Sequence, residues 1–219
     1  MEPGNWVFLH VLLLVFWLGT DLGVLILARA VRRNDLSFPQ RAVLLHYAMI
    51  IDILPRVCLT LSFAVGLHLA ASSGWVAPPP VAFAAAWIVG FLWLALLYAL
   101  YKAEGTPRHA VYAAFNLVLQ ALLSVGMIGL GVASLLGSGP FPAGWLAAKV
   151  LLFGLVFVCS IMIDIEFRPM APAFARLASE GSTVEVEAVI RRSVDRAVVW
   201  VVAIYVLLLS IAFLGSVKP

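Results

Sequence analysis

The sequence predicts an all-α membrane protein whose helical bundle crosses the bilayer six times. Of its 219 residues, 64% are hydrophobic and 11% are charged. A soluble domain carries roughly 45–50% hydrophobic residues and about 25% charged residues. The mean hydropathy is +1.08. The chain also contains six separate apolar stretches, each close to the ~20 residues that a membrane-crossing helix needs. These observations exclude a soluble enzyme, a disordered chain, a disulfide scaffold and a free nucleic-acid-binding protein.

Turn and helix-breaking residues separate the apolar stretches, and none of the breaks is long enough to divide domains. We therefore predict a single transmembrane domain over residues 1–219. Residues 37–49 are too polar for the core of the bilayer, so they are expected to extend the second helix or to lie in the interface. A polar connection is expected at 171–185, with a short helical piece around 174–178. The predicted spans are residues 6–28, 50–71, 81–101, 111–136, 145–165 and 198–214.

The positive charges divide unevenly between the two sides of such a bundle. Lys149 and Lys218 fall on one side and Arg56 falls within a span. Positively charged loops stay in the cytoplasm, so both termini are predicted to be periplasmic. The residues on the predicted cytoplasmic side are Arg29, Arg32, Arg33, Arg41, Lys102, Arg108, Arg168, Arg176, Arg191, Arg192 and Arg196.

Two histidines lie at matching depths in neighbouring antiparallel spans. His10 and His68 each lie about four residues from the outer end of their span, or roughly 6 Å deep at ~1.5 Å per residue. Paired histidines on adjacent helices can hold haem iron. The alternative is that each is an interfacial histidine with one solvated nitrogen. His46 and His109 lie near the cytoplasmic surface, and whether they bind anything is left open.

Charged side chains inside the spans form a second group. Asp52 and Arg56 are four residues apart and can pair within one helix, and Asp21 shares a helix face with His10 and Trp17. Such a group can hold helices together by buried pairing, bind an anionic group such as a haem propionate, or relay protons. The predicted polar network consists of Asp21, Asp52, Arg56, Asp164, Arg168 and Arg196.

Three further features are expected to serve helix packing or contact with the headgroups. Asn116 and Gln120 lie on one face of the fourth span, where buried amides join helices. Lys149 is expected to extend to the headgroups, or alternatively to neutralise a carboxylate near the histidine pair. Glycines 126, 129 and 131 are expected to let helices approach closely.

The first third of the chain resembles two related families. The run Trp6-Val7-Phe8-Leu9-His10, followed by Trp17-Leu18-Gly19, resembles the first helix of HemJ-type protoporphyrinogen oxidases and of CopD-type copper-resistance membrane proteins. Pro55-Arg56 followed by Gly66 is similar to their next helix, and the resemblance covers residues 5 to 72. It implies a haem-b-associated bundle in the bacterial inner membrane, with His10 as haem ligand. Asp21 and the helices beyond residue 105 depart from the HemJ pattern.

The sequence thus favours a haem-b-binding membrane redox protein that transfers electrons or oxidises a hydrophobic substrate such as a porphyrinogen or quinol. In this hypothesis His10 and His68 bind the iron, Trp17 lies beside the cofactor, and Arg56 or Lys149 anchors propionates. One alternative is a proton- or cation-coupled transporter that uses the intramembrane carboxylates. Another is an accessory subunit of a membrane complex. The lipid bilayer is the expected partner; a porphyrin or quinone, and a homo-oligomer, are open alternatives.

Overall fold

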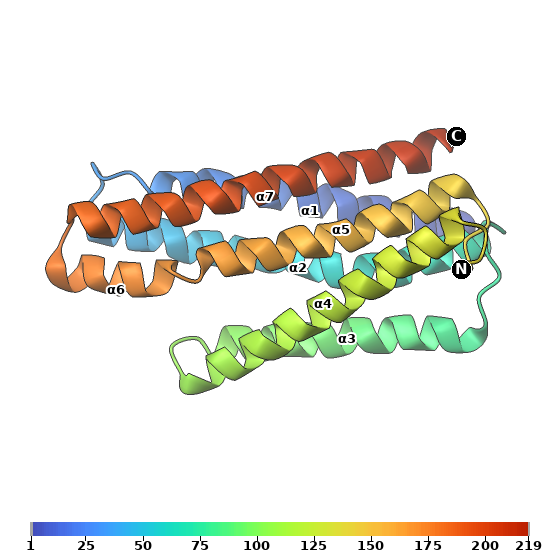
Figure 1. The fold of residues 1–219 in the computed structure, drawn as a ribbon, viewed down its shortest axis with the longest axis horizontal. Coiled ribbons are helices and arrows are strands. Elements are labelled where there is room, and N and C mark those ends of the chain that lie inside the picture. Colours follow the sequence, from blue (N-terminus) through green and yellow to red (C-terminus); the bar gives the residue numbers. More distant parts are fainter. Residues whose placement is uncertain (1, 219) are drawn as a thin grey trace.

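The computed structural model describes residues 2–218, and over these residues it confirms an all-helical fold. Six helices are long and apolar enough to cross a membrane, as predicted (Figure 1). A shorter helix, α6 (Met170–Glu180), precedes the last of them. The six long helices are α1 (Pro3–Val31), α2 (Phe38–Ser72), α3 (Pro80–Lys102), α4 (Pro107–Leu135), α5 (Gly144–Phe167) and α7 (Val184–Val217).

Local sequence signals explain where the helices begin and end. Three of them begin at a proline, whose missing N–H costs nothing in a first helical turn. Four connections contain a glycine with φ between 73° and 80°, a backbone conformation that other residues rarely adopt. α2 begins at Phe38, so the polar residues 37–49 extend the second helix as expected. The four glycines are Gly74, Gly105, Gly137 and Gly181.

The bundle has two distinct ends (Figure 1). Both termini and the α2–α3 and α4–α5 connections lie at one end, which we call the terminal end. The α1–α2 and α3–α4 connections and α6 lie at the opposite end, the α6 end. The residues that the sequence assigns to the cytoplasmic side lie toward the α6 end.

The helices pack unequally. The most extensive contacts join α1 to α2, α4 to α5 and α5 to α7, whereas α3 contacts α2 and α4 only sparsely. At the α4–α5 contact, a methyl group on Gly131 would stand 2.6 Å from the backbone nitrogen of Leu151. One on Gly154 would stand 2.8 Å from the backbone nitrogen of Ile128. The expected close approach of the fourth span therefore occurs at Gly131, but nothing lies near Gly126 or Gly129.

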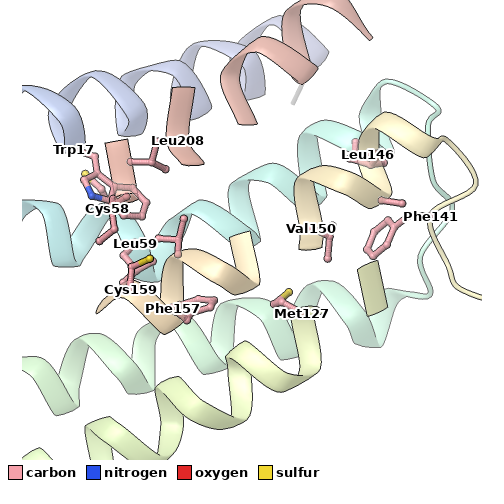
Figure 2. Close-up of a cluster of buried hydrophobic side chains, with 14 of the residues drawn as sticks. Trp17, Cys58, Leu59, Met127, Phe141, Leu146, Val150, Phe157, Cys159 and Leu208 are labelled. Atoms are coloured by element: carbon pink, nitrogen blue, oxygen red, sulfur yellow. The ribbon is translucent and has the colours of Figure 1, made fainter. Parts of the chain in front are cut away.

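Two apolar cores stabilise the bundle. The larger one extends from Trp17 and Cys58 to Phe141 and Leu146 (Figure 2). The smaller one lies at the α6 end, where Phe174 and its neighbours on α6 pack against α1 and α7. Most of the segment that the sequence describes as a polar connection is therefore helix α6, because its apolar residues recur at helical spacing and find a core to cover.

A buried ion pair fixes the α6 end. The side chain of Arg41 is 1% exposed. It donates to both carboxylate oxygens of Glu187, at 2.7 and 3.1 Å, and to the carbonyl of Val31 at 2.7 Å. These bonds join α2, α7 and the end of α1. The sequence analysis missed this pair because its members lie 146 positions apart.

Candidate functional site

A cluster of charged and amide side chains joins α2, α4 and α5 inside the bundle. Arg56 donates from Nε to Asp52 Oδ2 at 2.6 Å and from Nη2 to Asp164 Oδ1 at 3.2 Å. Gln120 and Asn116 donate amide hydrogens to Asp164 Oδ2 at 3.2 and 3.4 Å. We call these five residues, Asp52, Arg56, Asn116, Gln120 and Asp164, the carboxylate network. The predicted convergence of Asp52, Arg56 and Asp164 is present in the structure.

The network extends to α3 through a tryptophan that the sequence analysis did not select. The indole nitrogen of Trp93 donates to Asn116 Oδ1 at 2.9 Å, and both side chains are buried. Gln120 is also buried, and its Oε1 has no hydrogen-bond partner among residues 2–218. Trp93 is one of two tryptophans on the apolar helix α3, and its place in the middle of that helix was the available sequence signal.

Asp21 lies next to the network without joining it. Asp21 is buried, with 8% of the residue exposed, and no cation forms an ion pair with it within residues 2–218. The hydroxyl of Tyr205, on α7, lies close to this carboxylate and is itself buried without a hydrogen-bond partner. Asp21 is therefore an intramembrane carboxylate that lacks a paired cation.

Charge is unbalanced at this level of the membrane. Arg56 pairs with Asp52 and Asp164, and among residues 2–218 no cation is left to pair with Asp21. Ionised carboxylates are costly in a bilayer unless they are paired, protonated or bound to a cation. Pro55 also removes the N–H that would bond to the carbonyl of Ile51, which leaves one more acceptor beside Asp52.

The network and Asp21 lie at one level, nearer the α6 end. At ~1.5 Å per residue, Asp21, Arg56 and Asp164 lie roughly 24–30 Å from the terminal end of their helices. The side chains of Asp52, Arg56 and Asp164 are 25–32% exposed. Toward the terminal end, Trp17 and Cys58 belong to the closed apolar core (Figure 2). The network is thus partly exposed, whereas the core on its terminal-end side is closed.

Two arginines of the predicted network lie elsewhere. Arg196 contacts Glu166 at 3.4 Å, and no ion pair of Arg168 is present within residues 2–218. Asp195, the neighbour of Arg196 in the chain, pairs with Arg32 of the α1–α2 connection. Arg196 therefore pairs with a carboxylate near the end of α5, two positions beyond Asp164 in the chain, instead of joining the network.

His68 is enclosed by aromatic side chains. Its ring stacks between Trp6, at 4.4 Å between centroids, and Phe83, at 4.5 Å. Its Nε2 accepts a hydrogen bond from the indole of Trp87 at 2.9 Å. An imidazole that accepts at Nε2 and stays neutral carries its proton on Nδ1, so neither nitrogen offers a free lone pair in this conformation.

His10 faces the backbone of α2. A methyl group on Gly66 would stand 3.3 Å from Cε1 and 3.7 Å from Nδ1 of His10. This Nδ1 is buried and has no hydrogen-bond partner among the described residues. His46 and His109 have exposed side chains at the α6 end.

The residues assigned to propionate binding are dispersed. Arg56 belongs to the carboxylate network, whereas Lys149 lies near the terminal end with its Nζ against Gly215 of α7. The charge of Lys149 acts on His10. Trp17 is buried among apolar side chains with Cys58 and Leu208 nearby (Figure 2).

A haem held by both histidines does not fit this arrangement, because the acceptor nitrogen of His68 is occupied by Trp87 and both ring faces are covered. No three His, Cys, Asp or Glu side chains converge as metal ligands in the part of the chain that the structure describes. Haem b therefore stays a prediction of the sequence.

Comparisons with known proteins return no match to a protein-family model, to a curated protein or to a solved structure. The resemblance to HemJ-type and CopD-type proteins likewise stays a prediction.

Proposed function

We propose that the protein moves protons across the membrane, with Asp21 as the group that takes up and releases the proton. The observation that carries this proposal is the position of Asp21, buried at 8% exposure beside a network in which one arginine already serves two aspartates. A carboxyl group in this setting holds a proton at low cost and is costly when ionised, and intramembrane carboxylates of this kind mark ion pathways.

The surrounding residues have distinct roles in this proposal. Arg56 pairs with both Asp52 and Asp164 and so supplies the positive charge of the network. The hydroxyl of Tyr205 lies close to Asp21 and can donate to its carboxylate once the proton has left. Asp52, Arg56 and Asp164 are partly exposed whereas the core around Trp17 is closed. In this proposal the proton therefore enters from the α6 end, and its release at the other end requires the helices to move.

Proton flux into liposomes tests the proposal. Purified protein is reconstituted with a pH-sensitive dye inside, and a potassium diffusion potential drives protons inward. We expect faster acidification than in protein-free liposomes, abolished by Asp21→Asn and retained by Asp35→Asn. Asp35 is the matched control because it is an exposed loop carboxylate paired with Arg33. Equal rates in the wild type, in Asp21→Asn and in empty liposomes would contradict the proposal.

A second candidate function follows from His10. Its Nδ1 is buried and has no hydrogen-bond partner among residues 2–218. A nitrogen left without a partner supports the haem-b redox protein expected from the sequence, with His10 as the protein ligand. An absorption spectrum of protein made with ample haem tests it. A Soret band that disappears in His10→Ala and persists in His109→Ala, an exposed control, supports haem binding, and a colourless wild-type protein counts against it.

A further inference from the structure

An apolar groove of about 280 Å³ lies between α2, α3, α4 and α5. On α3 its wall includes the small residues Ala82, Ala86 and Gly90, which recur every four residues and so share one helix face. A methyl group on Gly90 would stand 3.2 Å from the carbonyl oxygen of Thr60. α2 and α3 therefore touch at this point, and their contact closes the inner side of the groove.

The lining offers almost no hydrogen-bonding group. Thr60 is the one side chain with a polar group besides the indole of Trp93, and its hydroxyl donates to the carbonyl of Val57 at 2.8 Å. The indole N–H of Trp93 is engaged by Asn116. The groove therefore recognises an apolar occupant.

The position of the groove indicates where that occupant comes from. It extends from Ala82, in the first turn of α3 at the terminal end, to Trp93, roughly 20 Å deep. Ala85 and Val89 line it and are exposed on the outer surface of the bundle, where the bilayer is the solvent. α3 packs sparsely against its neighbours. A hydrocarbon chain whose headgroup stays at the terminal-end interface matches this depth and direction.

Trp93 connects the groove to the carboxylate network. Its ring closes the deep end of the groove, and its indole nitrogen bonds to Asn116, which bonds in turn to Asp164. A chain that reaches the end of the groove therefore contacts the side chain that positions Asn116. Occupancy of the groove and the charge state of the network can influence each other through these two bonds.

We propose that this groove binds the hydrocarbon chain of a membrane amphiphile, and that this amphiphile is the substrate whose movement is coupled to protons at the carboxylate network. The coupling part of the proposal rests on the proposed function, whereas the binding part does not.

Photolabelling of the full chain in lipid nanodiscs tests the binding. The probe is a palmitic acid analogue with a diazirine near the end of its chain, and mass spectrometry locates the labelled residues. We expect labels on the groove residues of α3 and α4, in excess over the lipid-exposed faces of the same helices. Ala86→Phe, which fills the groove, should abolish them. Ala84→Phe should not, because Ala84 lies on the same helix but is exposed and does not line the groove.

A second pair of variants, on α4, repeats the test in case a substitution on α3 prevents folding. Leu123→Trp fills the groove from the other side, whereas Leu122→Trp places the same ring on a side chain that is 67% exposed. Monodisperse elution and helical circular dichroism establish that each variant is folded. Labelling that is uniform around the lipid-exposed surface, or unchanged by both groove-filling variants, overturns the binding.

The coupling is tested in the liposome assay with the same amphiphile. Palmitic acid in the membrane should increase proton flux in the wild type and in Ala84→Phe, but not in Ala86→Phe. If groove labelling is observed while Asp21→Asn leaves flux unchanged, the proposed function fails and the binding stands. If Asp21→Asn abolishes flux but the groove is unlabelled, the inference drawn here fails alone.

Discussion

The indole nitrogen of Trp87 donates a hydrogen bond to Nε2 of His68 at 2.9 Å, which joins α3 to α2 near the terminal end. Trp6 and Phe83 stack on the two faces of the same imidazole. One histidine thereby links α1, α2 and α3. Since α3 has few other contacts with the bundle, this cluster is a main attachment of α3.

Trp87→Phe should therefore lower the free energy of unfolding by about 1 kcal/mol, because a partly buried hydrogen bond is lost while an aromatic ring is kept. Tyr98→Phe is the control, since it removes a hydroxyl from an exposed tyrosine of the same helix that has no hydrogen bond among the described side chains. Thermal melts can be followed with a thiol-reactive dye, because Cys58 and Cys159 are free and buried in the folded protein. An unchanged melt for Trp87→Phe would mean that the bond does not hold α3.

Gly131→Ala and Gly129→Ala should have opposite effects although they lie two positions apart. At Gly131 the added methyl group would stand 2.6 Å from the backbone of Leu151, so α4 and α5 must separate, at a cost of about 2 kcal/mol. At Gly129 there is nothing within 4 Å, so alanine should stabilise the helix by up to about 1 kcal/mol. Equal melting temperatures for the two variants would contradict the close approach.

Glu187→Ala should destabilise the protein by about 3–5 kcal/mol, because it leaves the guanidinium of Arg41 buried and unpaired. Glu180→Ala is the matched control. It removes a carboxylate from an exposed pair with Arg176 and should leave the melt unchanged, since exposed ion pairs contribute little. If both variants melt alike, the Arg41 pair is solvated rather than buried.

Arg56→Gln should lower stability by about 2 kcal/mol, since Asp52 and Asp164 both lose their cation. This loss of stability is smaller than the loss expected on breaking a fully buried ion pair, because these side chains are partly exposed. The double variant Arg56→Gln with Asp52→Asn should recover part of the loss, because one of the unpaired charges is removed with it. A double variant that is less stable than the single one would show that Asp52 has another partner.

Much of the fold follows from the sequence, because hydropathy and residue spacing can be read from it directly. Hydropathy sets the six spans, and a four-residue spacing sets the pair of Asp52 and Arg56. The depth of His10 and His68 could be counted from the sequence in the same way. The direction in which each ring points could not, because it depends on the rotation of α3, which brings Phe83 and Trp87 to His68.

Long-range partners escaped the sequence analysis for a related reason. Tyr205 lies close to Asp21, and Trp93 bonds to Asn116, only because distant helices pack at those levels. Periodicity within one helix identifies its buried face but not the residue that it meets. The groove is a further case, since small residues on α3 predict a close helix contact as readily as a gap.

The orientation of the bundle gives a last prediction. From the positive charges near the α6 end we predict that this end faces the cytoplasm and that both termini face the periplasm. Single cysteines at Ser138, in the terminal-end α4–α5 connection, and at Glu104, in the α3–α4 connection, report on the two sides, and both positions are exposed. A membrane-impermeant maleimide added to intact cells whose outer membrane has been permeabilised should label Ser138→Cys alone. The native Cys58 and Cys159 are buried and contribute little background. Labelling of Glu104→Cys alone would reverse the orientation and with it the side from which Asp21 takes up protons in the described conformation.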